Sequence, residues 1–335
     1  MVEDTGFRFL VTGAQGCIGA WVIYHLVKAG YRPVAYDLDP TPRRLRLIAD
    51  AEDMERVQFI AGDITDADHL ARVISAHGIT HIIHLAALQV PMCRADPLLG
   101  ARVNVLGTLN VFEAARRFSD QVQRVVYASS AAVYGPPEAY DVDPVPESAP
   151  LLPATHYGVF KLCNEGNARV YWQDHGLTSI GLRPWTVYGV GRDQGLTSDP
   201  TRAIVAALLG RPFQIGFGGR TDMQYVEDVA RIFIACAAAP YEGAAVFNLR
   251  GEVVSVEDII EAIDAAVPGA RRLITHSGQQ IPIAPSLDDH GLRELLSEVP
   301  HTPLREGVAC TAERFRYLLQ EGCVEPAQLG LPAEP

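Results

Sequence analysis

The stretch Thr12-Gly13-Ala14-Gln15-Gly16-Cys17-Ile18-Gly19 determines the predicted fold. An apolar-rich run, residues 7–11, precedes it, and residues 20–26 follow with the apolar spacing of a helix. A strand, a glycine turn and a helix N-terminus form a site for a pyrophosphate, because glycines let the backbone approach the phosphates and the helix end offers free N–H groups. The residues that we expect to line this site are Gly13, Gln15, Gly16, Cys17, Ile18 and Gly19.

An acid follows at the end of the next strand-like run. Residues 32–37 form that run, and Asp37 closes it. A carboxylate at this point suits the ribose hydroxyls of NAD and repels the additional 2′-phosphate of NADP. We therefore predict NAD as the cofactor. If the protein prefers NADP instead, Arg43 or Arg44 is the residue that takes the phosphate.

Strand-like and helical segments alternate through the first half of the chain. Further apolar runs occur at residues 57–60, 81–85, 124–129 and 179–182, each separated from the next by a helix-length segment. This alternation is typical of a parallel sheet with helices on both faces. We predict an α/β fold, a Rossmann-type doubly wound parallel sheet. Beyond Pro184 the pattern loosens, although residues 246–249 have the composition of one more strand.

A tyrosine and a lysine stand four residues apart in the segment Tyr157-Gly158-Val159-Phe160-Lys161. On a helix they share one face, so the ammonium of Lys161 can approach the phenol of Tyr157. A nearby positive charge favours the phenolate and lowers the pKa of the tyrosine. A phenol of this kind takes the proton of a substrate alcohol while hydride leaves the same carbon. The spacing alone is weak, and a solvated surface pair is the alternative.

Composition restricts the partners of the protein. Among 335 residues, 48% are hydrophobic and the formal net charge is −12, which argues against binding to nucleic acid. No apolar run has the length of a membrane span, and we expect no signal peptide before Phe7. The six cysteines are scattered and no histidine has metal-ligand spacing, so we expect reduced thiols, a cytoplasmic location and no metal.

Ordered motifs connect these features to a known family. Besides the glycine stretch and the Tyr157–Lys161 pair, they occupy residues 62–64, 84–87, 104–108, 129–135 and 225–230. In this order, over about residues 7 to 310, they resemble the extended short-chain dehydrogenases/reductases of the NAD-dependent epimerase/dehydratase family. The resemblance implies a dinucleotide-binding domain at residues 1–183, with about 225–250 returning to its sheet. It also implies a smaller substrate-binding lobe at 184–224 and 251–330.

The resemblance also assigns roles to residues. It implies that Tyr157 is the acid/base, that Lys161 holds the nicotinamide ribose, and that a serine polarises the substrate hydroxyl. The spacing from Val133-Tyr134-Gly135 selects Ser130 for this role rather than Ser129. The further cofactor contacts that it implies are Asp63, Ile64, Leu85, Ala86, Ala87, Asn104, Ser129 and Pro184. A homodimer through the helices near residues 95–118 and 155–172 is also usual in the family.

Residues that this chain lacks exclude some of the reactions known in the family. Dehydratases of this family carry Asp-Glu after the catalytic hydroxyl residue, where this chain has Ala131-Ala132. Epimerisation and net dehydrogenation remain. Many nucleotide-sugar enzymes of the family have Arg-Asp-Phe before the Tyr-Val of the next strand, and this arginine binds the diphosphate of the substrate. The corresponding residues here are Thr221-Asp222-Met223, so Arg220 stands one place before the position of that arginine. A one-residue slip on a strand turns a side chain to the opposite face, which weakens the expectation of a diphosphate clamp.

Three functions follow, with the first slightly favoured. The first is a sugar epimerase that holds NAD tightly and acts on a nucleotide sugar. The second is a net NAD-dependent dehydrogenase of a free sugar, sugar acid or other small hydroxy compound. The third is a nucleotide-sensing protein without catalysis. Retention of Tyr157, Lys161 and Ser130 argues against the third. The candidate substrate-binding residues are Gln89, Ser130, Trp185, Thr186, Arg192, Thr197 and Arg220. For the loop that holds Arg192 and Thr197, a solvated loop before a helix is an equal alternative.

Overall fold

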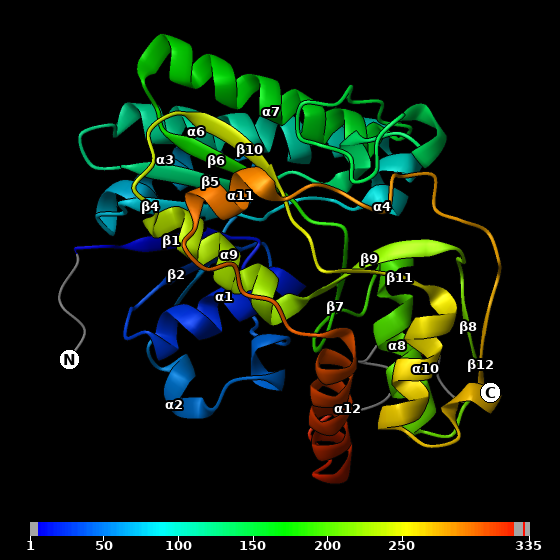
Figure 1. Cartoon of the computed structure of the whole chain (residues 1–335). Helices are drawn as coiled ribbons and strands as arrows, with labels where there is room; N and C mark the ends of the chain where they lie inside the picture. The colour runs from blue at the N-terminus through cyan, green and yellow to red at the C-terminus, as the bar shows by residue number, and fades with distance from the viewer. Residues whose placement is uncertain (1–5, 325–330, 332–335) are drawn as a thin grey trace.

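The computed structural model describes residues 6–324 and 331, and its centre is a seven-stranded sheet (Figure 1). All neighbouring strands in this sheet run parallel. Their order across the sheet is β10 (Ala244–Asn248), β6 (Ser179–Arg183), β5 (Arg124–Ala128), β4 (His81–His84), β1 (Phe9–Thr12), β2 (Val34–Asp37) and β3 (Gln58–Ala61). The predicted Rossmann-type sheet is confirmed.

The alternation of side chains along each strand produces two cores. Leu10 and Val125 are buried in one core, while their neighbours Val11 and Val126 are buried in the other, because successive strand residues face opposite sides. One face is covered by α3 (Ala67–Ala76), α6 (Gly107–Arg117) and α7 (His156–His175), and the other by α1 (Cys17–Lys28) and α9 (Val226–Ala238). The apolar runs in the sequence are therefore strands covered on both faces.

The strand order reverses beside β1. The chain passes from β1 outward through β2 and β3, then returns to β4 on the other side and continues through β5 and β6. In open α/β sheets, ligands bind in the crevice beyond the carboxyl ends of the strands at such a switch point. The glycine turn follows β1 directly, so the fold places it at this position.

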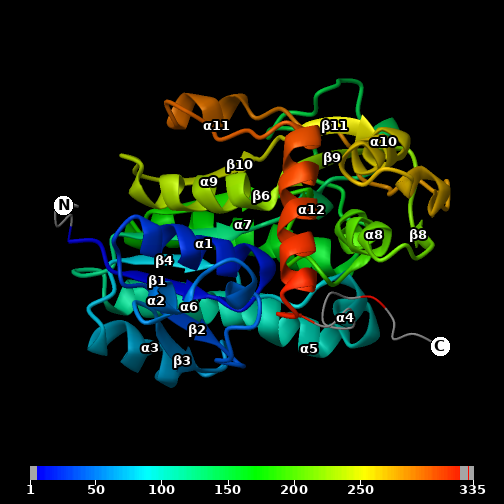
Figure 2. The ribbon, with the colours of Figure 1, turned by 90° about the horizontal axis from the view of Figure 1, so that it is seen from below.

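The second half of the chain contributes a smaller lobe. Its strands are β7 (Thr186–Tyr188), β9 (Arg220–Tyr225) and β11 (Glu252–Ser255) in one sheet, with β8 (Phe213–Ile215) and β12 (Ile274–His276) as a separate pair. Its helices are α8 (Asp199–Leu208), α10 (Val256–Ala266) and α12 (Leu304–Gln320). Figure 2 shows α12 between the other two lobe helices and the central sheet. Residues 325–330, the end of the predicted lobe, lie outside the described residues.

Short elements complete the description. They are α2 (Ala51–Met54), α4 (Val90–Ala95), α5 (Pro97–Ala101) and α11 (His290–Leu295), together with a π-helical turn at Arg102–Leu106 that joins α5 to α6. Over residues 6–324 and 331, no helix has the length and apolarity needed to cross a membrane, and histidines, cysteines and acids form no cluster suited to a metal. All six cysteines are free thiols.

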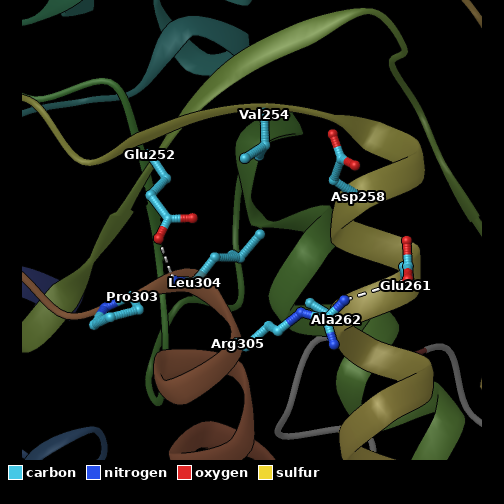
Figure 3. A pocket seen from close by; sticks show the side chains of 8 residues that line it. All are labelled: Glu252, Val254, Asp258, Glu261, Ala262, Pro303, Leu304 and Arg305. Carbon is cyan, nitrogen blue, oxygen red and sulfur yellow. Dashed lines mark hydrogen bonds and ion pairs between the residues drawn. The ribbon is translucent and has the colours of Figure 1, made fainter.

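A hollow of about 290 Å³ opens between β11, α10 and the start of α12 (Figure 3). Its polar groups are already engaged: Glu252 accepts a hydrogen bond from the backbone N–H of Leu304 at 3.0 Å, and Glu261 pairs with Arg305 at 3.2 Å. None of the predicted site residues lines it. The hollow is therefore separate from the predicted site.

Candidate active site

The glycine turn has the geometry of a phosphate cradle. Gly13 has a φ of +68°, and a Cβ there would lie 2.5 Å from the backbone nitrogen of Ala86, so only glycine fits. The N–H of Gly16 donates to the carbonyl of Gly13 at 2.9 Å, and Gly16 is the N-cap of α1. No side chain caps this helix, which leaves its first N–H groups directed at the cradle. The turn therefore fits the pyrophosphate of a dinucleotide.

Asp37 lies at the carboxyl end of β2, beside this turn. Its Oδ2 accepts a hydrogen bond from the backbone N–H of Gln15 at 2.9 Å. Burial raises the pKa of Asp37, while the bond from Gln15 opposes that rise. Arg44 and Arg43 are both engaged by other carboxylates, with Asp193 at 2.6 Å and Asp39 at 3.2 Å. The carboxylate and the prior engagement of both arginines favour NAD over NADP.

Further predicted cofactor contacts lie at Ile64 and in the segment after β4. Ile64 is buried, and a Cβ on Gly107 would meet its side chain at 2.7 Å. Asn104, on the π-helical turn, accepts from the N–H of Leu88 at 2.7 Å and donates to the carbonyl of Leu88 at 2.9 Å. It therefore fixes the segment that contains Leu85, Ala86 and Ala87. π-Helical turns occur frequently at functional sites, and here the turn directs one amide inward.

The predicted catalytic residues come from α7 and from the segment that follows β5. Thr155 caps α7 by accepting from the N–H of Gly158 at 3.0 Å, which sets the start of the helix one residue before Tyr157. Ser130 opposes the rise in the pKa of Tyr157, and the Nζ of Lys161 lies 5.5 Å from the centre of the tyrosine ring. This Nζ donates to the carbonyl of Ala128 at 2.6 Å. The structure thus brings the three predicted catalytic residues together.

The direction of one pKa shift differs from the prediction. Burial raises the pKa of Tyr157 above its usual value, although the hydrogen bond from Ser130 and the charge of Arg192 oppose the rise. Burial also lowers the pKa of Lys161 to about 8. The prediction that Lys161 brings the tyrosine below its usual pKa is wrong for this structure, since desolvation outweighs the neighbouring charges.

A buried network behind the catalytic helix was not predicted. The hydroxyl of Ser129 donates to Glu165 at 2.5 Å, and Arg183 binds the same carboxylate through two nitrogens at 2.9 and 2.8 Å. Ser129 therefore contacts the protein interior, while Ser130 contacts Tyr157. One signal was available, because Glu165 follows Lys161 by four residues and so shares its helix face.

Three predicted substrate residues form a group. Arg192 donates to the hydroxyl of Thr197 at 2.8 Å. Gly195 lies between them in sequence, and a Cβ there would meet both Gln89 and Arg192. The charge of Arg192 opposes the rise that burial causes in the pKa of Tyr157.

The other predicted substrate residues are placed differently. Trp185 is buried and donates its indole N–H to the carbonyl of Ala284 at 2.8 Å. Thr186 is also buried, and its hydroxyl bonds to that of Thr221 at 2.7 Å. Arg220 is exposed and lies 3.8 Å from Asp143. The one-residue offset thus places Arg220 at the surface while Thr221 occupies the interior.

Pro184 lies between β6 and β7. Its carbonyl accepts a hydrogen bond from the N–H of Ala131 at 2.9 Å. Asp63 also has a local role, since its side chain accepts from the N–H of Thr65 at 2.8 Å. Both residues keep the backbone in place at the edge where the cofactor fits.

A dinucleotide cradle beside a Ser–Tyr–Lys group at the end of a parallel sheet defines the class: a short-chain oxidoreductase that transfers hydride to and from a nicotinamide cofactor. A profile of the NAD dependent epimerase/dehydratase family matches residues 9–249. The chain belongs to this family, which confirms the resemblance found in the sequence, and NAD is its cofactor.

Similar proteins extend over nearly the whole chain. A UDP-glucose 4-epimerase of Mycolicibacterium smegmatis is 34% identical over 318 residues, which are 92% of this chain and 98% of the relative. The crystal structure of a UDP-glucose 4-epimerase of Thermotoga maritima with UDP-glucose has a TM-score of 0.81 at 25% identity, with 93% and 100% of the two chains covered. A partial consensus L-threonine 3-dehydrogenase has a TM-score of 0.82 at 26% identity, with 92% and 99% covered.

Proposed function

We propose that this protein is a nucleotide-sugar epimerase that oxidises a secondary alcohol of the sugar and reduces it again on the other face. The observation that carries the proposal is the grouping of Tyr157 with Lys161 at the dinucleotide cradle: the buried Nζ of Lys161 lies 5.5 Å from the centre of the tyrosine ring, and Ser130 opposes the rise in the pKa of Tyr157. The resemblance to UDP-glucose 4-epimerases along nearly the full chain supports a UDP-sugar as the substrate.

The residues divide the work of the reaction. NAD, when bound, supplies the acceptor for the hydride and returns it. Tyr157 takes the proton of the substrate hydroxyl and later gives it back, and Ser130 orients that hydroxyl through their shared hydrogen bond. Lys161 holds the ribose of the cofactor and adds positive charge next to the phenol. Because burial raises the pKa of Tyr157, the tyrosine starts protonated and needs these neighbours to act as a base.

Net dehydrogenation is the second candidate, and the position of Arg220 favours it. An arginine that is exposed and paired with Asp143 is a poor clamp for a substrate diphosphate. An unactivated sugar or sugar acid needs no such clamp. The two candidates differ in their products, because only the dehydrogenase accumulates NADH.

The test is to incubate the purified protein with UDP-glucose in the absence of added cofactor. Formation of UDP-galactose, separated by anion-exchange chromatography, without a rise in absorbance at the wavelength of NADH supports the epimerase. NADH production with added NAD and free sugars or sugar acids supports the dehydrogenase.

We also propose a cytoplasmic homodimer. The six free thiols support a reducing compartment. Met92 on α4, Leu98 on α5 and Val159 on α7 are exposed apolar side chains on helices that contact each other, which supports association through this face. Light scattering combined with size-exclusion chromatography tests this, and Leu98→Glu is expected to shift the dimer to monomer.

A further inference from the structure

The connection between β7 and α8 contacts α1 and the segment that follows β2. We call residues 190–197 the strap. Its first residue is attached to α1, because the indole N–H of Trp21 donates to the carbonyl of Val190 at 2.9 Å. Its second residue is packed against Arg44, since a Cβ on Gly191 would lie 3.5 Å from the Cδ of that arginine.

One guanidinium then joins the strap to the glycine turn. Arg44 binds Asp193 of the strap at 2.6 Å through Nη2, and it donates through Nη1 to the carbonyl of Gln15 at 2.7 Å. The Arg44 and Asp193 side chains are each only 22% exposed, so the ion pair is partly protected from water and salt. Gln15 in turn donates its backbone N–H to Asp37. The contact therefore connects the strap to both residues that bracket the ribose and pyrophosphate positions.

A second contact joins the strap to the start of α1. The thiol of Cys17, the first residue of that helix, donates to the carbonyl of Val190 at 4.0 Å. The strap therefore lies against the N-terminal turn of the helix that borders the cradle.

The segment that carries Arg44 has its own anchor in the lobe. The Nε of Arg314, on α12, donates to the carbonyl of Leu47 at 2.6 Å. Arg44 precedes the turn that contains Leu47. The turn that follows Arg44 is thus attached to the lobe as well.

From these contacts we infer that the Arg44–Asp193 ion pair is a latch that holds the strap over the dinucleotide and slows the release of NAD. The strap must separate from the glycine turn before a dinucleotide can leave, and this separation breaks the ion pair and the bond to Gln15. The inference rests on the proposed function, because an epimerase returns hydride to the same substrate and gains from a cofactor that stays bound.

The experiment measures the rate at which NAD dissociates from the full-length protein. The protein is loaded with NAD and desalted, an excess of ADP-ribose is added to block rebinding, and the NAD that remains bound is quantified with time. The variants are Arg44→Ala, Asp193→Asn and the double variant. Arg43→Ala is the matched control, because Arg43 is the adjacent arginine but its side chain is 77% exposed and pairs with Asp39.

We expect each single variant to release NAD roughly tenfold faster, which corresponds to about 1.4 kcal/mol. The double variant is expected to be no faster than the singles, since both remove the same pair. Arg43→Ala is expected to behave like the native protein. The inference is contradicted if the single variants release NAD at the native rate. It is also contradicted if the acceleration in the double variant equals the product of the accelerations in the two single variants.

Two features keep the outcome interpretable. Asp193→Asn keeps the shape of the side chain, so it tests the latch even if Arg44→Ala disturbs folding. The measurement requires no sugar. If the variants release NAD at the native rate while the native protein epimerises UDP-glucose, only this inference is contradicted. If the variants release NAD faster but the native protein epimerises nothing, only the proposed function is contradicted.

Discussion

The sheet domain and the smaller lobe hold their site residues in different ways. In the sheet domain, two predicted site residues hydrogen-bond to the backbone. Lys161 donates to the carbonyl of Ala128, and Asn104 bonds to both the N–H and the carbonyl of Leu88. In the lobe, Arg192 is held by the side chain of Thr197. Backbone positions follow from strand order, whereas contacts between side chains depend on every neighbouring residue. The chemistry therefore follows from motifs, and the choice of substrate does not.

The largest expected effect tests the sheet domain. Tyr157→Phe removes the only proton carrier assigned to the reaction, and we expect turnover to fall by roughly a thousandfold, within the range of general acid–base catalysis. NAD affinity should remain within about twofold of native, as measured by isothermal titration calorimetry. Tyr171→Phe is the control on the same helix, because Tyr171 bonds to Glu113 instead. Substantial turnover in Tyr157→Phe would remove the tyrosine from the mechanism.

The second prediction concerns the energetic effect of the buried lysine. Burial lowers the pKa of Lys161 to about 8 in the folded protein. Below pH 8 the lysine is charged in both states, and its burial opposes folding. Between pH 8 and its unfolded pKa of roughly 10.4, the unfolded state binds more protons, so stability from this group rises with pH.

Lys161→Met should therefore be inactive yet more stable without NAD. We expect a gain of roughly 3 kcal/mol near pH 7, from 1.36 kcal/mol per pKa unit, which declines toward zero by about pH 10. Urea unfolding of the native protein and the variant at several pH values measures the difference. A variant less stable than native at pH 7 would show that the bond to Ala128 outweighs desolvation.

A smaller effect is expected at the ribose position. Asp37→Asn keeps the shape but removes the charge, and we expect NAD to bind roughly tenfold more weakly while the preference for NAD over NADP decreases. Titration with both cofactors measures the two affinities. Asp39→Asn is the control two residues away, on an exposed side chain. If the native protein already prefers NADP, the interpretation of Asp37 is wrong.

The smallest expected effects compare two arginines of the lobe. Arg192→Ala should raise the KM for substrate roughly tenfold, because its charge acts at Tyr157. Arg220→Ala should change the KM by less than about twofold, since this arginine is exposed beside Asp143. Steady-state kinetics on both variants measures the two KM values. The reverse order of effects would assign the substrate clamp to Arg220 and would move the substrate site toward β9.

The sequence predicted the sheet domain better than it predicted the contacts of the lobe. The alternation of strand-like runs with helix-length segments indicated the parallel sheet, and the family's motif spacing selected Ser130 over Ser129. The pKa of Tyr157 could not be predicted, because desolvation depends on packing from distant segments. Helix periodicity indicates only that Glu165 shares a face with Lys161, and it does not identify Arg183 as the partner of Glu165. Arg44 and Asp193 are 149 residues apart, and no local pattern signals that pair. The position of Arg220 could be predicted only as far as its strand face.

The most direct test of the central claim is mass spectrometry of the nucleotide released when the freshly purified protein is denatured. The central claim is that the sheet domain and the strap together hold NAD through the catalytic cycle. The account predicts NAD in nearly stoichiometric amount. A protein that releases no nucleotide, or releases NADP, would contradict it.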